Sequence, residues 1–453
     1  MADELARLDA IAQADLVHTG ETTPLELVDA AISRIEQVNP QLNAVITPLF
    51  EKARTQAKST DLADGPFKGV PFLLKDFGCH SAGDTYHQGT RFLKDLGWTA
   101  KEDTYMAAKL RAAGFVFLGK TNTPEFASMP TTEPEAYGPT RDPWNTNHST
   151  GGSSGGAGAA VASGMVPAAH ANDGGGSTRI PASECGLVGL KSTRARASLG
   201  PEYGEIWQGL VNEHVATRSV RDTAAILDVI AGPMPGDPYF ASLPARPFLE
   251  EVGADPGQLR IGFLADFPGK AVPLHPDCVT AVQETVQLLG ALGHRLEAAY
   301  PSALDAEQEL RRHVWAILTS AIASHLDTLS KQTGKQISQD DVEINTWAMA
   351  EIGRTRTAVR YIEAIEWLQS DTRRIAGWWQ PEDGKDGFDL LLTPTITEPP
   401  SKLGEFVSTP DNPLGAARRS APLMPFALPF NVTGQPAISL PLYWNSEGII
   451  ACL

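Results

Sequence analysis

Cysteine is scarce in this 453-residue sequence, which has four, far apart and without a C-x-x-C pair: Cys79, Cys185, Cys278 and Cys452. This spacing excludes a disulfide framework and is typical of free thiols in a reducing cytoplasm. No two histidines have the H-x-x-x-H spacing of a metal-binding helix, and none lies near a cysteine at zinc-finger spacing. We therefore expect no zinc site and no other bound metal.

Long apolar runs and clusters of positive charge are also missing. No stretch of 18 apolar residues occurs, so we expect no transmembrane helix, and residues 1–5 lack the basic start of a signal peptide. The 37 lysines and arginines are outnumbered by 54 aspartates and glutamates, which gives a net charge of -17. Such a chain binds nucleic acid and anionic membranes poorly. We expect a cytoplasmic protein that acts on a small molecule.

What the sequence does contain is an alternation of short apolar runs with helical patterns. Strands are predicted at 69–76, 115–118, 166–171, 186–190, 259–264, 388–392 and 437–440. Helices are predicted from Pro24 to a stop at Asn39-Pro40, and over 103–113, 157–164, 277–292 and 305–380. This alternation predicts an α/β layer fold with a mostly parallel or mixed sheet.

Two motif matches do not fit their surroundings. Residues 114–121 match G-x-x-x-x-G-K-[ST], but the four residues between the glycines are bulky, apolar and predicted to be a strand rather than a phosphate-binding loop. Residues 151–155 match G-x-S-x-G, but a polar loop precedes them, and the last histidine of the chain, His325, lies in a helical pattern. We expect neither a nucleotide site nor a nucleophile elbow.

Two Gly/Ser-rich segments, 150–158 and 172–181, flank one predicted helix and strand. One such loop alone is typical of a turn. In the second loop, three consecutive glycines at 174–176 can turn successive N–H groups toward one point, and Ser177 would stand beside the oxyanion hole that they form. A serine nucleophile needs a base, and burial would lower the pKa of Lys75 at the end of an apolar strand. An exposed strand-end charge is the alternative interpretation of Lys75.

With these segments in view, the sequence resembles the amidase signature family of Ser–Ser–Lys amide hydrolases. The resemblance runs from the first helix to about residue 443, and its motifs are 69–76, 119–125, 151–156, 172–181, 189–193, 219–222, 392–395 and 429–436. It implies the amidase signature fold, a large twisted mixed β-sheet covered by helices on both faces. Within the family, the sequence is similar to nylon-oligomer amidases and to carbamate-cleaving urethanases.

The resemblance implies a role for each matching residue. Ser177 would be the nucleophile, Ser153 the bridging serine after a cis peptide bond, and Lys75 the base, with no cofactor. The backbone N–H groups of Gly174, Gly175, Gly176 and Ser177 would form the oxyanion hole, and the site would be supported by Asp173, Arg179 and Ser154. Gly174 stands where the family usually has Thr or Ile, so we expect a more open site.

The resemblance also implies an organisation of the chain. Residues 1–453 would form a single amidase domain, with N-terminal helices at 1–60, the catalytic core at 65–235 and a helical insertion at 300–385 that forms part of the substrate pocket. The chain stops before the family's last strand and closing helix. An exposed sheet edge would follow, which favours self-association as a homodimer.

The expected function is hydrolysis of amide C–N bonds through a Ser177 acyl-enzyme, with carbamate cleavage as well. The alternatives are hydrolysis of a cyclic nylon oligomer, the amidase subunit of a transamidation complex, and a binding protein without activity. The expected substrate pocket is mostly apolar and favours aryl or neutral acyl groups; its residues are Phe126, Ala127, Ser128, Met129, Tyr137, Tyr203, Ile206 and Trp207.

Overall fold

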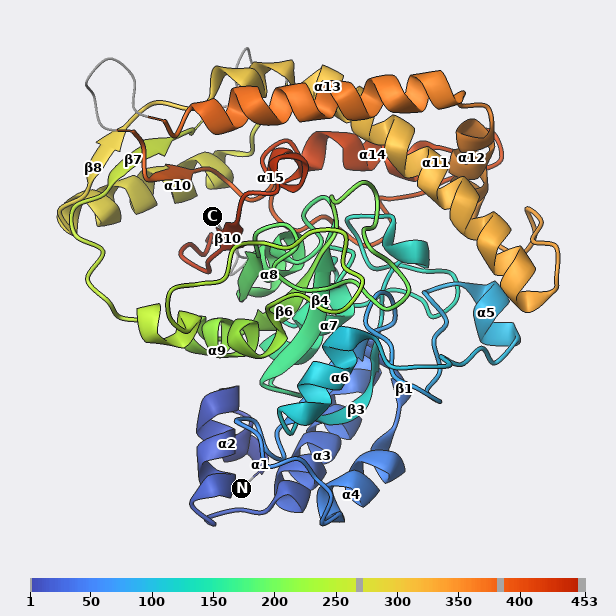
Figure 1. Cartoon of the computed structure of the whole chain (residues 1–453), viewed down its shortest axis with the longest axis vertical. Helices are drawn as coiled ribbons and strands as arrows, with labels where there is room; N and C mark the ends of the chain where they lie inside the picture. Colours follow the sequence, from blue (N-terminus) through green and yellow to red (C-terminus); the bar gives the residue numbers. More distant parts are fainter. Residues whose placement is uncertain (1, 266–271, 381–386, 447–453) are drawn as a thin grey trace.

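A seven-stranded mixed sheet forms the centre of the computed structural model, which describes residues 2–265, 272–380 and 387–446 (Figure 1). Strand β2 pairs in parallel with β3 and β4, and the other pairs are antiparallel. The strand order is β1 (Val45–Pro48), β3 (Val116–Thr121), β2 (Pro71–Lys75), β4 (Ala168–Asp173), β6 (Asn212–Thr217), β5 (Val188–Lys191) and β10 (Ala437–Ser439).

Side-chain alternation along each strand divides the apolar core into two layers. In β2, Leu73 packs on one side, while Phe72 and Leu74 pack on the other. The first layer contains residues of α3 (Pro24–Leu42), α4 (Phe50–Lys58), α7 (Gly155–Ala162) and α8 (Arg179–Cys185), and the second those of α2 (Ala10–His18), α6 (Tyr105–Ala112) and α9 (Val220–Ile230). Because both faces are covered, central strands are apolar almost throughout, and the predicted fold class is confirmed.

A separate sheet of three parallel strands lies apart from the first: β8 (Arg295–Glu297), β7 (Arg260–Phe263) and β9 (Leu390–Leu392). Helix α10 (Pro276–Ala291) packs Ala281 and Val282 against it. The sequence predicts strands β7 and β9 but assigns them to one large sheet. Hydrophobic pattern identifies a strand without naming its partner, so the second sheet is a correction.

The predicted helical segment 305–380 forms α11 (Glu307–Thr333), α12 (Ile344–Arg354) and α13 (Ala358–Gly377). Figure 1 shows these helices at one end of the molecule, with α14 (Gly415–Ser420) and α15 (Leu428–Thr433) beneath them and α2 to α4 at the other end. The remaining helices of the described residues are α1 (Ala2–Leu5), α5 (Arg91–Asp95) and the short 3-10 turns Glu125–Ala127, Phe248–Glu251, Ser302–Ala306 and Ala421–Leu423. No helix in the described ranges is long and apolar enough to cross a membrane.

Two local predictions have clear outcomes. The strand predicted within residues 114–121, which match G-x-x-x-x-G-K-[ST], is confirmed, because β3 covers Val116–Thr121. The Lys120 side chain in this strand is fully buried. The predicted helix stop at Asn39-Pro40 is wrong, since α3 continues to Leu42. Pro40 lies in the last turn, where few backbone bonds remain to be lost. The Asn39 side chain then accepts the N–H groups of Ala44 and Val45, each at 2.8 Å.

Candidate active site

Lys75 is the last residue of β2 and is fully buried. Its Nζ lies 2.7 Å from Ser153 Oγ, 2.9 Å from Ser154 Oγ and 2.6 Å from Asn172 Oδ1. Burial lowers the pKa of Lys75 to about 7, although the nearby carboxylates of Glu213 and Asp173 favour its charged form. A large share of Lys75 is therefore neutral near neutral pH, which a base requires.

Ser153 lies in the turn before α7, and the Gly152–Ser153 peptide bond is cis, as the resemblance implies. A Cβ at Gly152 would meet the backbone of Thr131 at 2.5 Å, so only glycine fits there. The Ser153 side chain is buried against Lys75. Ser154 also contacts Lys75, and its hydroxyl donates to the backbone carbonyl of Asn172 at 3.3 Å. Ser153 and Ser154, two of the three serines predicted for the catalytic machinery, thus contact Lys75, the candidate base.

Asp173 and Arg179 bracket the loop that carries Ser177. Asp173 ends β4 and Arg179 begins α8, and the guanidinium donates to both carboxylate oxygens at 2.9 Å. Burial alone would raise the pKa of Asp173, but the charge and hydrogen bonds of Arg179 hold it well below its usual range. Asn431 of α15 completes the cluster, donating to the Asp173 backbone carbonyl and accepting from Arg179. Its motif was noted in the sequence, but its contact was not predicted.

The glycine loop presents fewer free donors than expected. The N–H of Gly176 donates to Asp173 Oδ1 at 2.7 Å and is therefore not free for an oxyanion. Within residues 2–265, 272–380 and 387–446, no hydrogen bond uses the backbone N–H of Gly174, Gly175 or Ser177. Those three groups remain the candidate oxyanion donors.

The hydroxyl of Ser177 makes no hydrogen bond to any other described residue, Ser153 included. The Lys75–Ser153 half of the expected relay is thus assembled, and the Ser153–Ser177 half is open. Catalytic hydrogen bonds are often long in a free enzyme and shorten when the substrate binds. The open Ser153–Ser177 contact is therefore compatible with the expected relay.

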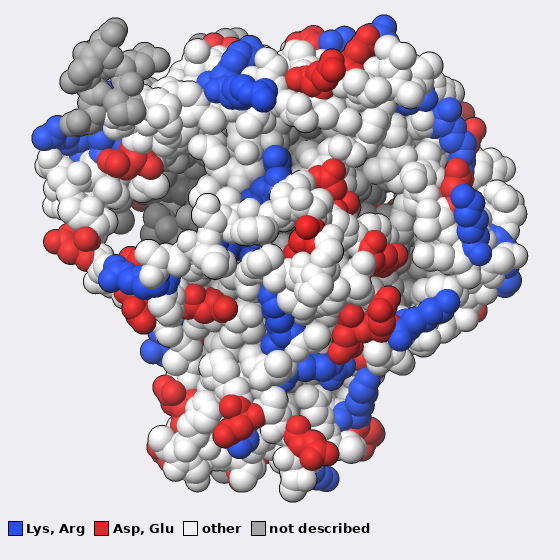
Figure 2. Space-filling view, viewed as in Figure 1, with Lys and Arg blue, Asp and Glu red and all other residues white. Residues whose placement is uncertain are grey.

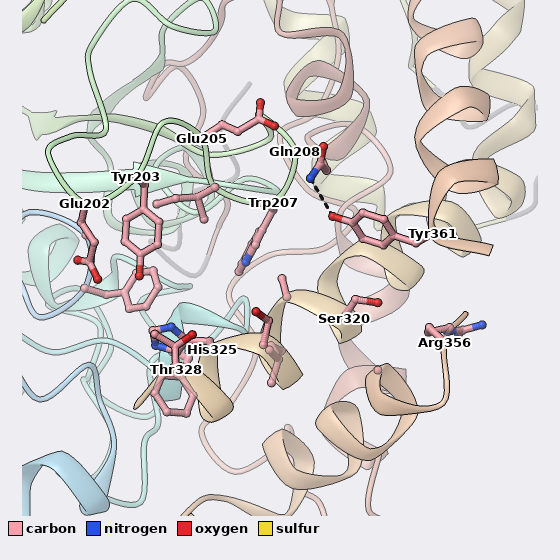
Figure 3. A pocket seen from close by; sticks show the side chains of 18 of the residues that line it. Glu202, Tyr203, Glu205, Trp207, Gln208, Ser320, His325, Thr328, Arg356 and Tyr361 are labelled. Carbon is pink, nitrogen blue, oxygen red and sulfur yellow. Dashed lines mark hydrogen bonds between the residues drawn. The ribbon is translucent and has the colours of Figure 1, made fainter. Parts of the chain in front are cut away.

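Two cavities meet at Trp207. The smaller, about 110 Å³, contains Ser177, Gly174 and Gly175, and its other walls are mainly apolar. The larger, about 750 Å³, has Glu202 and Tyr203 on one side of Trp207 and Arg356 and Tyr361 on the other (Figure 3). We place the chemistry in the smaller cavity because the candidate nucleophile lines it.

The predicted pocket residues divide between these cavities. Ala127, Ser128 and Met129 line the smaller cavity, and Phe126, Tyr203 and Ile206 line the larger. Trp207 lines both, as already described.

The structure differs from two expectations about the pocket. Tyr137 lines neither cavity: its hydroxyl lies 2.5 Å from His87 Nδ1, and the Lys94 ammonium stands 4.2 Å from its ring centroid. The space beside Gly174 is not open, because a Cβ there would meet the Trp207 ring at 2.7 Å. The indole takes the room that a larger side chain would use.

Sequence reasoning missed several residues of the smaller cavity, including Arg311 and Trp315 of α11. A helical pattern shows which residues are apolar but not which cavity they face.

Among the described residues, no group of three or more His, Cys, Asp and Glu side chains could hold a metal ion. On the face shown in Figure 2, acidic and basic side chains are interspersed.

A family model described as "Amidase" matches residues 26–449. The fold and this match define an amide hydrolase, a class that cleaves C–N bonds. The chain belongs to the amidase signature family, as its motifs predict.

The chain is similar to characterised proteins and solved structures of this family. The 6-aminohexanoate-cyclic-dimer hydrolase of Paenarthrobacter ureafaciens is 43% identical over 449 residues, covering 97% of this chain and 89% of that protein. A solved structure of 6-aminohexanoate cyclic dimer hydrolase complexed with substrate has a TM-score of 0.92 at 41% identity, covering 99% of this chain and 92% of the other. A bacterial aryl acylamidase, 24% identical with a TM-score of 0.87, shares the fold over 98% of this chain and 91% of its own.

Proposed function

We propose that this enzyme hydrolyses neutral cyclic or short linear oligo-amides of the nylon type through an acyl-enzyme on Ser177. The observation that carries the proposal is the buried contact of Lys75 with Ser153, at 2.7 Å, next to a loop with unused N–H donors. Support for the substrate class comes from the mainly apolar wall of the smaller cavity and from the two relatives named for a cyclic amide dimer.

In the proposed reaction, neutral Lys75 takes a proton from Ser153 while Ser153 takes one from Ser177. The Ser177 oxygen then attacks the amide carbonyl, and the N–H groups of Gly174, Gly175 and Ser177 stabilise the oxyanion; losing one such donor typically costs about 2.7–4 kcal/mol of barrier. The relay runs backward to protonate the leaving nitrogen. Water, activated by the same groups, hydrolyses the ester. No step uses a cofactor.

A substrate panel tests this proposal. The panel contains 6-aminohexanoate cyclic dimer, an acyl 4-nitroanilide and a small aryl carbamate, each with wild type, Ser177→Ala and Ser163→Ala. Ser163 caps α7 with a hydroxyl bonded to the Ala159 carbonyl, so it is the matched serine control. We expect ring opening of the cyclic dimer, detected as a new primary amine on the linear product, in wild type and Ser163→Ala only. No amide cleavage by wild type, or full activity in Ser177→Ala, contradicts the proposal.

We also propose carbamate cleavage, a cytoplasmic location and a homodimer. Carbamate cleavage uses the same planar carbonyl, and the panel decides it separately. Cys79 and Cys278 are buried free thiols, which supports a cytoplasmic location. A homodimer through an exposed sheet edge is supported by β10, which is an edge strand among the described residues and has an exposed Ile438.

A further inference from the structure

A buried polar cluster behind Lys75 has no part in the proposed reaction. Its members are His170 and Asn172 of β4 and Glu213 of β6, and all are at most 5% exposed. The antiparallel pairing of β4 and β6 places Asn172 directly opposite Glu213. A buried carboxylate is costly unless it is paired, so each of its contacts is informative.

The contacts of Asn172 give its amide one orientation. Its Nδ2 donates to the Phe77 carbonyl at 3.1 Å and to Glu213 Oε1 at 3.3 Å, while its Oδ1 lies 2.6 Å from Lys75 Nζ. A flipped amide would set its carbonyl against the carboxylate and its NH2 against the lysine amine. Glu213 therefore holds the side-chain carbonyl of Asn172 toward the Lys75 amine.

His170 links the same carboxylate to the backbone of Lys75. The backbone N–H of Lys75 donates to His170 Nδ1 at 3.3 Å, so the ring proton of a neutral His170 is on Nε2, which faces Glu213 Oε2. Burial lowers the pKa of His170 and so favours the neutral ring, although the charge and hydrogen bond of Glu213 act in the opposite direction. Glu213 thus accepts from two N–H donors, the arrangement that suits an ionised carboxylate.

The loop after β2 closes this cluster. Gly78, at φ +92°, passes so near that a Cβ would meet Asn172 Nδ2 at 2.4 Å and Glu213 Oε1 at 2.6 Å. No side chain but hydrogen fits there, and the close backbone shields the cluster from water. A charge in such a place acts strongly on its neighbours.

We propose that Glu213 is a positioning residue for the catalytic base. It holds the side-chain carbonyl of Asn172 against the Lys75 amine, and it places a negative charge near that amine. The inference rests on the proposed function, because it takes Lys75 as the base. The charge of Glu213 favours protonated Lys75, so it moves the onset of activity toward higher pH. Other titratable or charged groups around Lys75 are Lys120 on β3, His170 and Asp173 on β4, Asp76 after β2 and Arg179 on α8.

The test is the pH profile of kcat/KM for Glu213→Gln on a neutral amide. Gln keeps the shape of the Glu213 side chain and loses its charge. We therefore expect the acid limb, the low-pH range over which kcat/KM rises, to move to lower pH by about one unit, within the range that one nearby charge produces. Glu213→Asp keeps the charge and should leave the limb at the wild-type pH with a lower kcat. The matched control is Asp371→Asn, a buried carboxylate on α13 that pairs with Arg374 and contacts none of these residues; its limb should not move.

Two outcomes decide against the inference. A folded Glu213→Gln enzyme whose limb stays at the wild-type pH overturns it, provided that Lys75→Ala is inactive. If Glu213→Gln does not fold, Asn172→Ala decides instead: loss of the acceptor should also move the limb to lower pH, and an unmoved limb overturns the inference. Full activity in Lys75→Ala would instead overturn the proposed function.

Discussion

Burial alone does not make a lysine a base in this protein. Lys75, Lys120 and Lys191 are all fully buried, and burial lowers the pKa of each. The Lys120 amine faces the Cys79 carbonyl, and that of Lys191 faces its neighbouring backbone carbonyl. Among the three, Lys75 alone contacts serine hydroxyls. The contacts rather than the burial select it.

Substitutions of single residues should follow this selection. Lys75→Ala, Ser153→Ala and Ser177→Ala should each lower kcat by about a thousandfold or more, because members of a relay fail as a unit. Ser154→Ala should be milder, since the Ser154 hydroxyl donates to the backbone carbonyl of Asn172 and takes no part in the proposed proton relay. Steady-state kinetics with circular dichroism as a folding check measures this. A dead Ser154→Ala beside a near-normal Ser153→Ala would exchange the roles of the two serines.

Activity should depend on the protonation of Lys75. The pKa of about 7 lies well below that of a free lysine, so activity should rise as pH passes through about 7 and the amine becomes neutral. It should fall below that pH, where protonated Lys75 accepts no proton. A profile of kcat/KM from pH 5 to 9 checks this. A flat profile across that range would remove Lys75 as the base.

At the scale of elements, the end of β4 and the start of α8 are held together by one buried ion pair. Arg179→Ala would leave Asp173 buried and unpaired, a change that typically costs about 3–5 kcal/mol of unfolding free energy. Arg221→Ala removes an exposed pair with Asp9 and should cost about 0–1 kcal/mol. Urea unfolding of both variants measures the difference. Equal losses would mean that the loop does not depend on the buried pair.

How much of the site the sequence predicts depends on the element that carries each residue. Lys75 follows an apolar run and Ser177 follows a glycine run, so both stand out. Glu213 does not, because β6 begins Asn-Glu-His, which is too polar for a predicted strand and is buried through its pairing with β4 and β5. Tyr137 has the residue type of a pocket wall, but the direction of a loop side chain is not encoded locally.

At the scale of the whole molecule, alternating strands and helices predict the layered fold well, because each local pattern agrees with the global one. Division into two sheets and placement of α11 beside the nucleophile loop depend on long-range packing, which no local pattern contains. The position of Trp207 between two cavities is the clearest case: the sequence predicts Trp207 as a pocket residue but not that it lines two cavities.

Trp207 should set the size of acyl group that reaches Ser177. Removing the indole in Trp207→Ala joins the two cavities, so kcat/KM for a bulky acyl anilide relative to a small one should rise by about tenfold, the scale of pocket-size discrimination. The matched control is Trp144→Ala, a half-exposed indole packed on Trp444. Paired assays of both anilides give the ratio. An unchanged ratio in Trp207→Ala would show that the indole is no barrier.

The proposed acyl-enzyme contains a covalent ester bond between Ser177 Oγ and the acyl group of the substrate. Acid quenching of the enzyme during turnover of a slowly deacylated acyl ester, followed by peptide mass spectrometry, locates that bond. We predict the acyl mass on Ser177 and none in Ser177→Ala. An acyl group on Ser153 or Ser154, or a burst of released product with no acylated peptide, would contradict it.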